Sequence, residues 1–336
     1  MATIDEQDRA RFAEDGYLVL RGLLDPDRDL APLRLEYAAL LDLVAARLHS
    51  AGVASSTHAN VAFGRRFCAL VSEVGGRLLN HLDISLPQTG IAADTPIHCG
   101  PAVFGLITNP RLLDAVEAVV GPEIYSNPTQ HVRIKPPEDC LHRDETIVGE
   151  VAQTVWHQDL GTVLPEADAS RILTVWIAVS EATRDNGCLL VAPGSHRRGL
   201  VAHRPDPHAN YSRHAIPDRL VGDRRVALEM EPGDVLFMDK LTVHASLPNR
   251  SQNIRWSVDL RYQPTGEPTG RPWFPGFVAR SRAAPQSVLP DAAAWRALWH
   301  EARARLAGGP STAFQRWPQA TSQGGTPDHD SHTLNG

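Results

Sequence analysis

Between residues 123 and 262 the chain is a succession of short β-prone runs divided by Gly, Pro and Asn. Many short strands separated by turn residues are typical of a β-sandwich or a barrel. The pattern therefore predicts a mainly β protein with flanking helices and with a barrel core over residues 123–265. The runs span residues 123–125, 130–135, 154–158, 171–179, 188–192, 226–230, 234–237, 243–246 and 254–262.

The N-terminal third, residues 1–122, has helical patterns instead. Acidic residues in a first turn and Gly16 as a stop predict a helix over residues 5–15, followed by a short apolar strand at 17–20. Residues 26–49 carry leucines with charges between them, which fits a long amphipathic helix. Residues 50–67 are polar and contain Gly, so a loop is expected there.

Two further helices complete the expected domain. One begins at Pro110 and ends at Gly121-Pro122, and the other covers residues 284–307 with Trp295, Leu298 and Trp299 on one face. We expect residues 1–307 to form a single domain. Residues 308–336 are rich in Gly, Pro, Ser, Thr and Gln, and this composition predicts a disordered tail.

Two connections between the expected strands are long, at residues 136–153 and 197–225. Long connections in a compact domain tend to be functional lids or binding loops. We expect both to border the mouth of the barrel. The alternative is that they are ordinary surface insertions.

Composition excludes several classes of function. The formal net charge of −6 and the pI near 6.2 give no electrostatic reason to expect nucleic acid or an anionic membrane as a partner. No run of about 18 apolar residues and no standard signal sequence occurs, so a cytoplasmic protein is expected. The four Cys are far apart and form no Cys-x-x-Cys pair, which predicts reduced thiols.

The stretch Trp156-His157-Gln158-Asp159 contains a candidate half of a metal site. Side chains alternate along a strand with period two, so His157 and Asp159 would project from one face. That spacing lets both residues bind one ion. A lone His-x-Asp pair is a weak signal in a chain with 15 His.

A second histidine strengthens the signal. His244 follows the turn Pro232-Gly233-Asp234 and an apolar strand. Two imidazoles and one carboxylate make the facial triad of mononuclear iron(II) oxygenases, which leaves positions open for a co-substrate and oxygen. Ser246 shares a strand face with His244.

The alternation of residues 254–262 predicts a second charge inside the barrel. Arg255, Ser257, Asp259 and Arg261 fall on one face of this strand, and Arg255 can lie beside the His244 face. An Arg inside a barrel is costly unless an anion meets it, and a guanidinium is well shaped to hold a carboxylate. A dicarboxylate co-substrate would supply that anion. The alternative is an ordinary salt bridge to Asp259.

In these ordered motifs the chain resembles the phytanoyl-CoA dioxygenase family of iron(II)- and 2-oxoglutarate-dependent oxygenases. The resemblance covers roughly residues 10–265. It implies a double-stranded β-helix, a jelly-roll barrel with helices packed outside. The motifs are Phe12-Ala13-Glu14-Asp15-Gly16-Tyr17-Leu18-Val19-Leu20, Ile134-Lys135-Pro136-Pro137, Trp156-His157-Gln158-Asp159-Leu160, Asn186-Gly187-Cys188-Leu189, Pro193-Gly194-Ser195-His196, Pro232-Gly233-Asp234, His244-Ala245-Ser246 and Arg255.

The resemblance also implies roles for individual residues. His157, Asp159 and His244 would bind the iron. The distal carboxylate of 2-oxoglutarate would be held by Arg255 and Ser246. Other residues would line the co-substrate pocket or make polar contacts there, and for the last two a plain core or rim position is an equal alternative: Lys135, Trp176, Thr174 and Gln130.

The implied function is an oxygenase that uses iron(II), 2-oxoglutarate and O2 to oxidise a small organic substrate with release of succinate and CO2. Related halogenases lack the carboxylate ligand, so Asp159 favours an oxygenase. Hydroxylation of a C–H bond is the preferred reaction, and desaturation and ring rearrangement, which use the same triad, are the alternatives. A secondary metabolite is the preferred substrate, and an acyl-CoA is the alternative. The oligomeric state is open, with a homodimer as one form.

Two rival functions fit the same motifs less well. A non-catalytic metabolite-binding barrel would be free to lose its ligands, and the complete triad with Arg255 argues against it. A zinc hydrolase would use the same three ligands, but no evident general base lies beside them. His131 and His142 precede the metal stretch, and solvated surface positions are expected for both.

Overall fold

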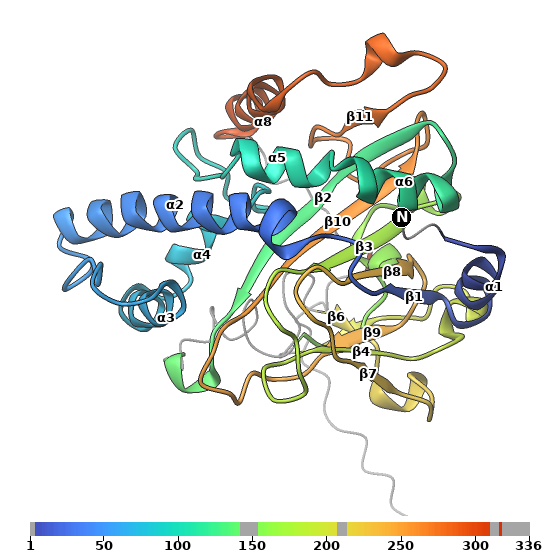
Figure 1. Ribbon diagram of the computed structural model, residues 1–336, viewed down its shortest axis with the longest axis horizontal. Coiled ribbons are helices and arrows are strands. Elements are labelled where there is room, and N and C mark those ends of the chain that lie inside the picture. Colours follow the sequence, from blue (N-terminus) through green and yellow to red (C-terminus); the bar gives the residue numbers. More distant parts are fainter. Residues whose placement is uncertain (1–3, 142–153, 207–213, 310–315, 318–336) are drawn as a thin grey trace, which may run out of the picture.

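The computed structural model describes residues 4–141, 154–206, 214–309 and 316–317. At its centre a six-stranded antiparallel sheet, in the order β1-β8-β3-β10-β2-β11, faces a three-stranded sheet in the order β7-β4-β9 (Figure 1). The short pair β5 and β6 forms a separate ribbon. The strands are β1 (Tyr17–Leu20), β2 (Ile124–Lys135), β3 (Leu173–Ala178), β4 (Leu189–Val191), β5 (Arg204–Pro205), β6 (His214–Ala215), β7 (Val226–Leu228), β8 (Val235–Asp239), β9 (His244–Ser246), β10 (Arg255–Pro264) and β11 (Phe277–Arg280).

Helices from both ends of the chain cover the outer face of the large sheet, while the small sheet lies on its other side (Figure 1). The predicted double-stranded β-helix with flanking helices is confirmed. The helices are α1 (Glu6–Asp15), a π-turn (Pro26–Leu30), α2 (Ala31–Ser50), α3 (Phe63–Val74), α4 (Arg77–Leu82), α5 (Pro101–Ile107), α6 (Pro110–Val120) and α8 (Ala292–Leu306).

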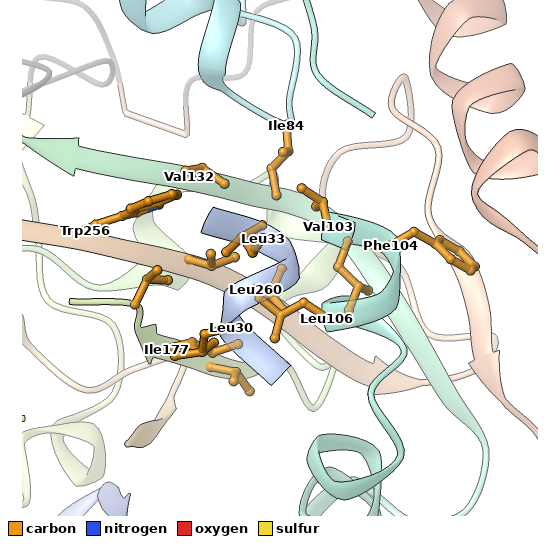
Figure 2. Close-up of a cluster of buried hydrophobic side chains, with 14 of the residues drawn as sticks. Leu30, Leu33, Ile84, Val103, Phe104, Leu106, Val132, Ile177, Trp256 and Leu260 are labelled. Atoms are coloured by element: carbon orange, nitrogen blue, oxygen red, sulfur yellow. The ribbon is translucent and has the colours of Figure 1, made fainter. Parts of the chain in front are cut away.

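Alternation along β10 separates the apolar core from the barrel interior. Trp256, Val258 and Leu260 belong to the core beneath the helices, as the sequence predicts. Figure 2 shows Leu260 near Leu30 and Leu33 of the N-terminal helical segment and Trp256 near Val132, all in one apolar cluster. The Trp256 ring also stacks on Phe63 of α3, with 5.1 Å between the ring centroids. The polar side chains of β10 are therefore directed into the barrel.

Two predictions of local structure need correction. The loop predicted over residues 50–67 ends early, because α3 begins at Phe63 and buries Phe67, Leu70, Val71 and Val74 at helical spacing. The predicted runs at 123–125 and 130–135 are parts of one strand, β2. Its pairing with β10 shifts between Asp259 and Arg261, and this irregularity interrupts the pattern that marked two runs.

Part of the predicted lids and tail lies outside the described residues, namely 142–153, 207–213 and most of 310–336. Arg316 and Trp317 are exceptions to the predicted disorder of the tail, because both pack against the barrel. The sequence has a single Trp there, and it lacks the periodic apolar neighbours that indicate a packed element. Among the described helices none is long and apolar enough to cross a membrane.

A half-buried carboxylate fixes the start of α5 to α2. Glu36 accepts hydrogen bonds from His98 Nε2 at 2.8 Å and from the Ala102 backbone N–H at 2.7 Å. Burial by itself would raise the pKa of Glu36, but these hydrogen bonds outweigh it and the pKa lies below its usual range. The ionised form of Glu36 therefore stabilises the fold at pH values above the pKa that a Glu has in the unfolded chain, about 4.3. This stability is lost as the pH falls through the lower pKa of the folded protein.

We expect Glu36→Gln to lower the free energy of unfolding by about 1–2 kcal/mol at pH 7, because an amide accepts these hydrogen bonds less strongly than a carboxylate. The difference from wild type should narrow as the pH falls through the lowered pKa of Glu36, because the carboxyl then becomes protonated in the wild type as well. Urea unfolding at pH 7 and at lower pH measures both effects. The exposed Glu301→Gln serves as the control, and an equal loss in both variants would contradict the assignment.

Candidate active site

The three predicted metal ligands converge inside the barrel. His157 and His244 face each other as an antiparallel bridge, with each backbone N–H donating to the other carbonyl at 2.9 Å. The Nε2 atoms of both rings lie 3.8 Å from Asp159 Oδ1. One ligand atom from each residue falls within 4.8 Å of the others. These residues can hold a metal ion on one side of an open cavity.

Backbone carbonyls orient both imidazole rings. His157 Nδ1 lies 2.9 Å from Val155 O, and His244 Nδ1 lies 2.9 Å from Thr242 O. Each contact requires the proton on Nδ1 and leaves the Nε2 lone pair facing the ligand cluster. Burial and the neighbouring His244 lower the pKa of His157 to about 3, so the ring is neutral, as metal binding requires.

Asp159 reaches the site from a turn and not from a strand, which corrects the strand spacing predicted for His157 and Asp159. It begins a 3-10 helix over Asp159–Thr162. Burial would raise the pKa of Asp159, but Arg261 and the two histidines hold it below its usual range. Arg261 Nη2 donates to Asp159 Oδ1 at 2.9 Å, and the Thr174 hydroxyl donates to Oδ2. Both carboxylate oxygens are thus oriented before a metal arrives.

The Thr174 contact gives a testable expectation. Thr174→Val keeps the shape of the side chain but removes the donor to Asp159, so the carboxylate loses one of its two orienting contacts. We expect metal affinity to fall by about tenfold, the low end for residues that orient ligands. Titration of the apo protein with Mn(II) measures it. Thr108→Val, whose hydroxyl donates to Phe104 O within the helical layer, is the matched control, and equal metal affinity in both variants would argue against this role.

Beside the ligands, two cations line the same cavity of about 980 Å³, which opens to solvent. Arg255 and Lys135 are partners across β10 and β2. Lys135 Nζ donates to Ser246 Oγ and to Leu247 O, both at 2.7 Å. Arg255 Nη1 donates to Ser257 Oγ at 3.0 Å, and its guanidinium carbon lies 5.4 Å from the centre of the Trp176 ring. The predicted co-substrate residues Arg255, Ser246, Lys135 and Trp176 are therefore neighbours.

Within the described part of the chain, this pair of cations has no anionic partner. Among the described residues no carboxylate forms an ion pair with Arg255 or Lys135, and Arg255 Nε is buried without a hydrogen-bond partner. Burial lowers the pKa of Arg255 to about 10, and burial together with Arg255 lowers the pKa of Lys135 well below its usual value. The salt bridge from Arg255 to Asp259 that was the alternative is absent from these contacts. Such a site favours a bound anion.

The remaining two co-substrate candidates have protein partners. Thr174 lines the cavity, but its hydroxyl points to Asp159. Gln130 is buried in β2, and its amide nitrogen donates to Ile84 O at 2.9 Å. Gln130 therefore links the sheet to the segment after α4 and does not line the described cavities.

A second cavity of about 1150 Å³ also adjoins the ligands, with His157, Asp159 and Arg261 in its wall, and it shares His157 and Arg261 with the first cavity. His131 lies in this wall and not on a solvated surface, which corrects that expectation; His142 lies outside the described residues. His131 Nδ1 is 2.8 Å from Asp83 Oδ2, and the Ile84 and Val132 backbone N–H groups donate to Asp83 Oδ1. Burial lowers the pKa of His131, so a neutral, oriented imidazole borders this cavity.

Two site residues were not assigned a role from the sequence. Arg261 shared the predicted inward face with Arg255, and that alternation was the signal that could have placed it at Asp159. Asp83 carries no such signal, because it follows α4 in a segment without periodicity and meets His131 through the tertiary fold alone.

Known proteins with similar sequences share a family with this chain. The family model described as phytanoyl-CoA dioxygenase (PhyH) matches residues 12–257. A probable phytanoyl-CoA dioxygenase of Caenorhabditis elegans is 30% identical over 168 residues, which are 48% of this chain and 51% of that protein. A 1-deoxypentalenic acid 11-beta-hydroxylase of Streptomyces arenae is 33% identical over 180 residues, 50% of this chain and 60% of that protein. The chain thus spans about half the length of the curated relatives it matches.

The fold also has a counterpart among solved structures. The epimerase SnoN, in complex with Fe3+, alpha ketoglutarate and nogalamycin RO, superposes with a TM-score of 0.50 at 20% sequence identity. The match covers 79% of this chain and 86% of that chain. At this identity the likeness concerns the fold.

Proposed function

Because the chain belongs to the phytanoyl-CoA dioxygenase family, we propose that it is an iron(II)- and 2-oxoglutarate-dependent dioxygenase that hydroxylates a C–H bond of a small organic substrate. The observation that carries this proposal is the pair of buried cations, Arg255 and Lys135, in the cavity of the His157, Asp159 and His244 cluster. A metal site alone would suit many enzymes. A metal site beside an anion pocket suits a dicarboxylate that also reaches the metal.

The residues of the site have separate proposed roles. His157, Asp159 and His244 would bind iron(II), which supplies oxygen activation when 2-oxoglutarate is bound. Arg255 would hold the distal carboxylate of 2-oxoglutarate, and Lys135 would add positive charge beside it. Lys135 also fixes the Ser246 hydroxyl, which accepts from Lys135 Nζ and from the Thr154 N–H and can donate its own proton to that carboxylate. Trp176 covers the guanidinium and excludes water from it.

The substrate is proposed to occupy the second cavity, whose wall includes the metal ligands His157 and Asp159. A secondary metabolite is the preferred class, because the Streptomyces arenae relative is named as a hydroxylase of a small carboxylic acid. An acyl-CoA thioester is the second candidate, because relatives at 30–31% identity are named phytanoyl-CoA dioxygenases.

Product analysis tests the proposal. Purified protein with iron(II), ascorbate, 2-oxoglutarate and a panel of terpenoid acids, polyketides and acyl-CoA thioesters should form succinate in proportion to a hydroxylated product. That product should be 16 mass units heavier than the substrate under ordinary O2 and 18 mass units heavier under 18O2. Oxidation of an acyl-CoA alone would select the second candidate. Substrate turnover that needs zinc and no 2-oxoglutarate would overturn the dioxygenase in favour of a hydrolase.

A further inference from the structure

Two residues from the C-terminal segment contact the turn that carries Asp159. Trp317 Nε1 donates to Gly161 O at 2.9 Å. Arg316 Nε donates to Val163 O at 3.2 Å, and its guanidinium also forms an ion pair with Asp168. The Arg316 side chain is 7% exposed, so this contact is a packed one. These hydrogen bonds reach the 3-10 turn at Gly161 and the chain just beyond the turn at Val163.

Trp317 is also connected, through His203, to the backbone between the metal ligands His157 and Asp159. The Trp317 ring stacks on His203, with ring centroids 4.9 Å apart and planes inclined by 24°. His203 Nε2 in turn accepts the Gln158 backbone N–H at 3.1 Å. Gln158 is the residue between His157 and Asp159. Displacement of Trp317 would therefore uncover the imidazole that fixes this peptide.

Gly161 makes the close packing of this turn against His203 possible. A Cβ atom at this position would lie 2.5 Å from His203 Cε1 and 2.7 Å from Nε2, closer than real side chains approach. The Gly161 backbone is thus in contact with His203 on one side, while its carbonyl accepts from Trp317. The turn, the imidazole and the indole form one packed unit.

We propose that Arg316 and Trp317 form a C-terminal clamp that holds the Asp159 turn in the geometry required for metal binding. Both are positioning residues and neither touches the metal. The proposal rests on the metal site of the proposed function. Its physical basis is that a carboxylate on a short turn binds a metal well when its backbone is fixed beforehand, and residues that orient ligands set metal affinity.

The alternative role for these contacts is general stabilisation of the fold. The two roles predict different measurements. A stabilising tail would change the unfolding of the metal-free protein, whereas a clamp on the ligand turn would change metal affinity in protein that remains folded.

Full-length apo variants titrated with Mn(II), with free Mn(II) followed by electron paramagnetic resonance, separate the roles. We expect Trp317→Ala and Arg316→Ala each to weaken Mn(II) binding by about tenfold, with apo melting temperatures near wild type. Trp317→Phe keeps the stacking but loses the N–H donor, so its affinity should be intermediate. Arg296→Ala, which removes a hydrogen bond from α8 to Cys99 O, is the matched control and should bind as wild type does.

Wild-type affinity in both Arg316→Ala and Trp317→Ala would overturn the clamp. If Trp317→Ala does not fold, Trp317→Phe is compared with Arg296→Ala instead. Equal Mn(II) affinity in these two variants would also overturn the clamp. Asp159→Ala, measured in parallel, distinguishes failure of the proposed clamp from failure of the metal site itself. Wild-type protein that binds no Mn(II), or binding that Asp159→Ala leaves unchanged, would overturn the metal site and the clamp together.

Discussion

Asp159→Ala is expected to abolish 2-oxoglutarate turnover and to reduce metal affinity by more than about 100-fold, since loss of a ligand should exceed the cost of losing a residue that orients one. The substitution removes the one carboxylate of the cluster and leaves the two imidazoles beside the Arg261 guanidinium. That cation then faces the metal position without its anionic partner. Both changes act against a divalent ion.

Metal content after anaerobic loading and succinate formation measure the two effects of this variant. Asp159→Asn is the matched variant, because it keeps the volume and an acceptor for Arg261 while removing the negative charge. It should also fail to turn over. Circular dichroism of both variants verifies that the fold persists. Wild-type turnover in folded Asp159→Ala would contradict the site assignment.

Arg255→Ala is expected to raise the 2-oxoglutarate concentration needed for half-maximal rate by roughly 30- to 1000-fold, which corresponds to about 2–4 kcal/mol for loss of one partner of a buried charge pair. The maximal rate should change less, because the distal carboxylate lies away from the reacting atoms. The buried Lys135 remains in the variant, so binding is weakened and not eliminated. Initial rates at varied 2-oxoglutarate measure the effect.

Two further variants test the geometry of the Arg255 contact. Arg255→Lys retains a charge but lacks the planar pair of donors, and we expect intermediate affinity. Arg250→Ala alters an exposed Arg in the turn before β10 and should behave as wild type. A normal 2-oxoglutarate requirement in Arg255→Ala would exclude this side chain from co-substrate binding.

The alternation of β10 is the part of the fold that sequence reasoning predicted best. Period two fixes which side chains face the barrel once one face is apolar, so Arg255 and Asp259 could be separated from Trp256 and Val258 without a structure. The same rule placed His244 and Ser246 on one face. The family and the barrel class predicted from these motifs are confirmed, while the dioxygenase activity is proposed, and iron(II) and 2-oxoglutarate fit the residues present.

Other features were beyond sequence reasoning for physical reasons. The Asp159 turn satisfies the same His-x-Asp spacing as a strand would, so spacing alone could not distinguish the two. The pairing of His131 with Asp83 joins residues 48 positions apart through the tertiary fold. Trp317 contacts His203 from a segment whose composition predicts disorder, because a single anchored residue leaves no periodic pattern.

Anaerobic titration with iron(II) and 2-oxoglutarate is the most direct measurement on the proposed centre. A weak visible metal-to-ligand charge-transfer band should appear when both are present, with neither sufficient alone, and it should be lost in His244→Ala. It should need far more 2-oxoglutarate in Arg255→Ala. Protein that shows no band and instead retains tightly bound zinc would contradict an iron and 2-oxoglutarate centre, even within the same barrel.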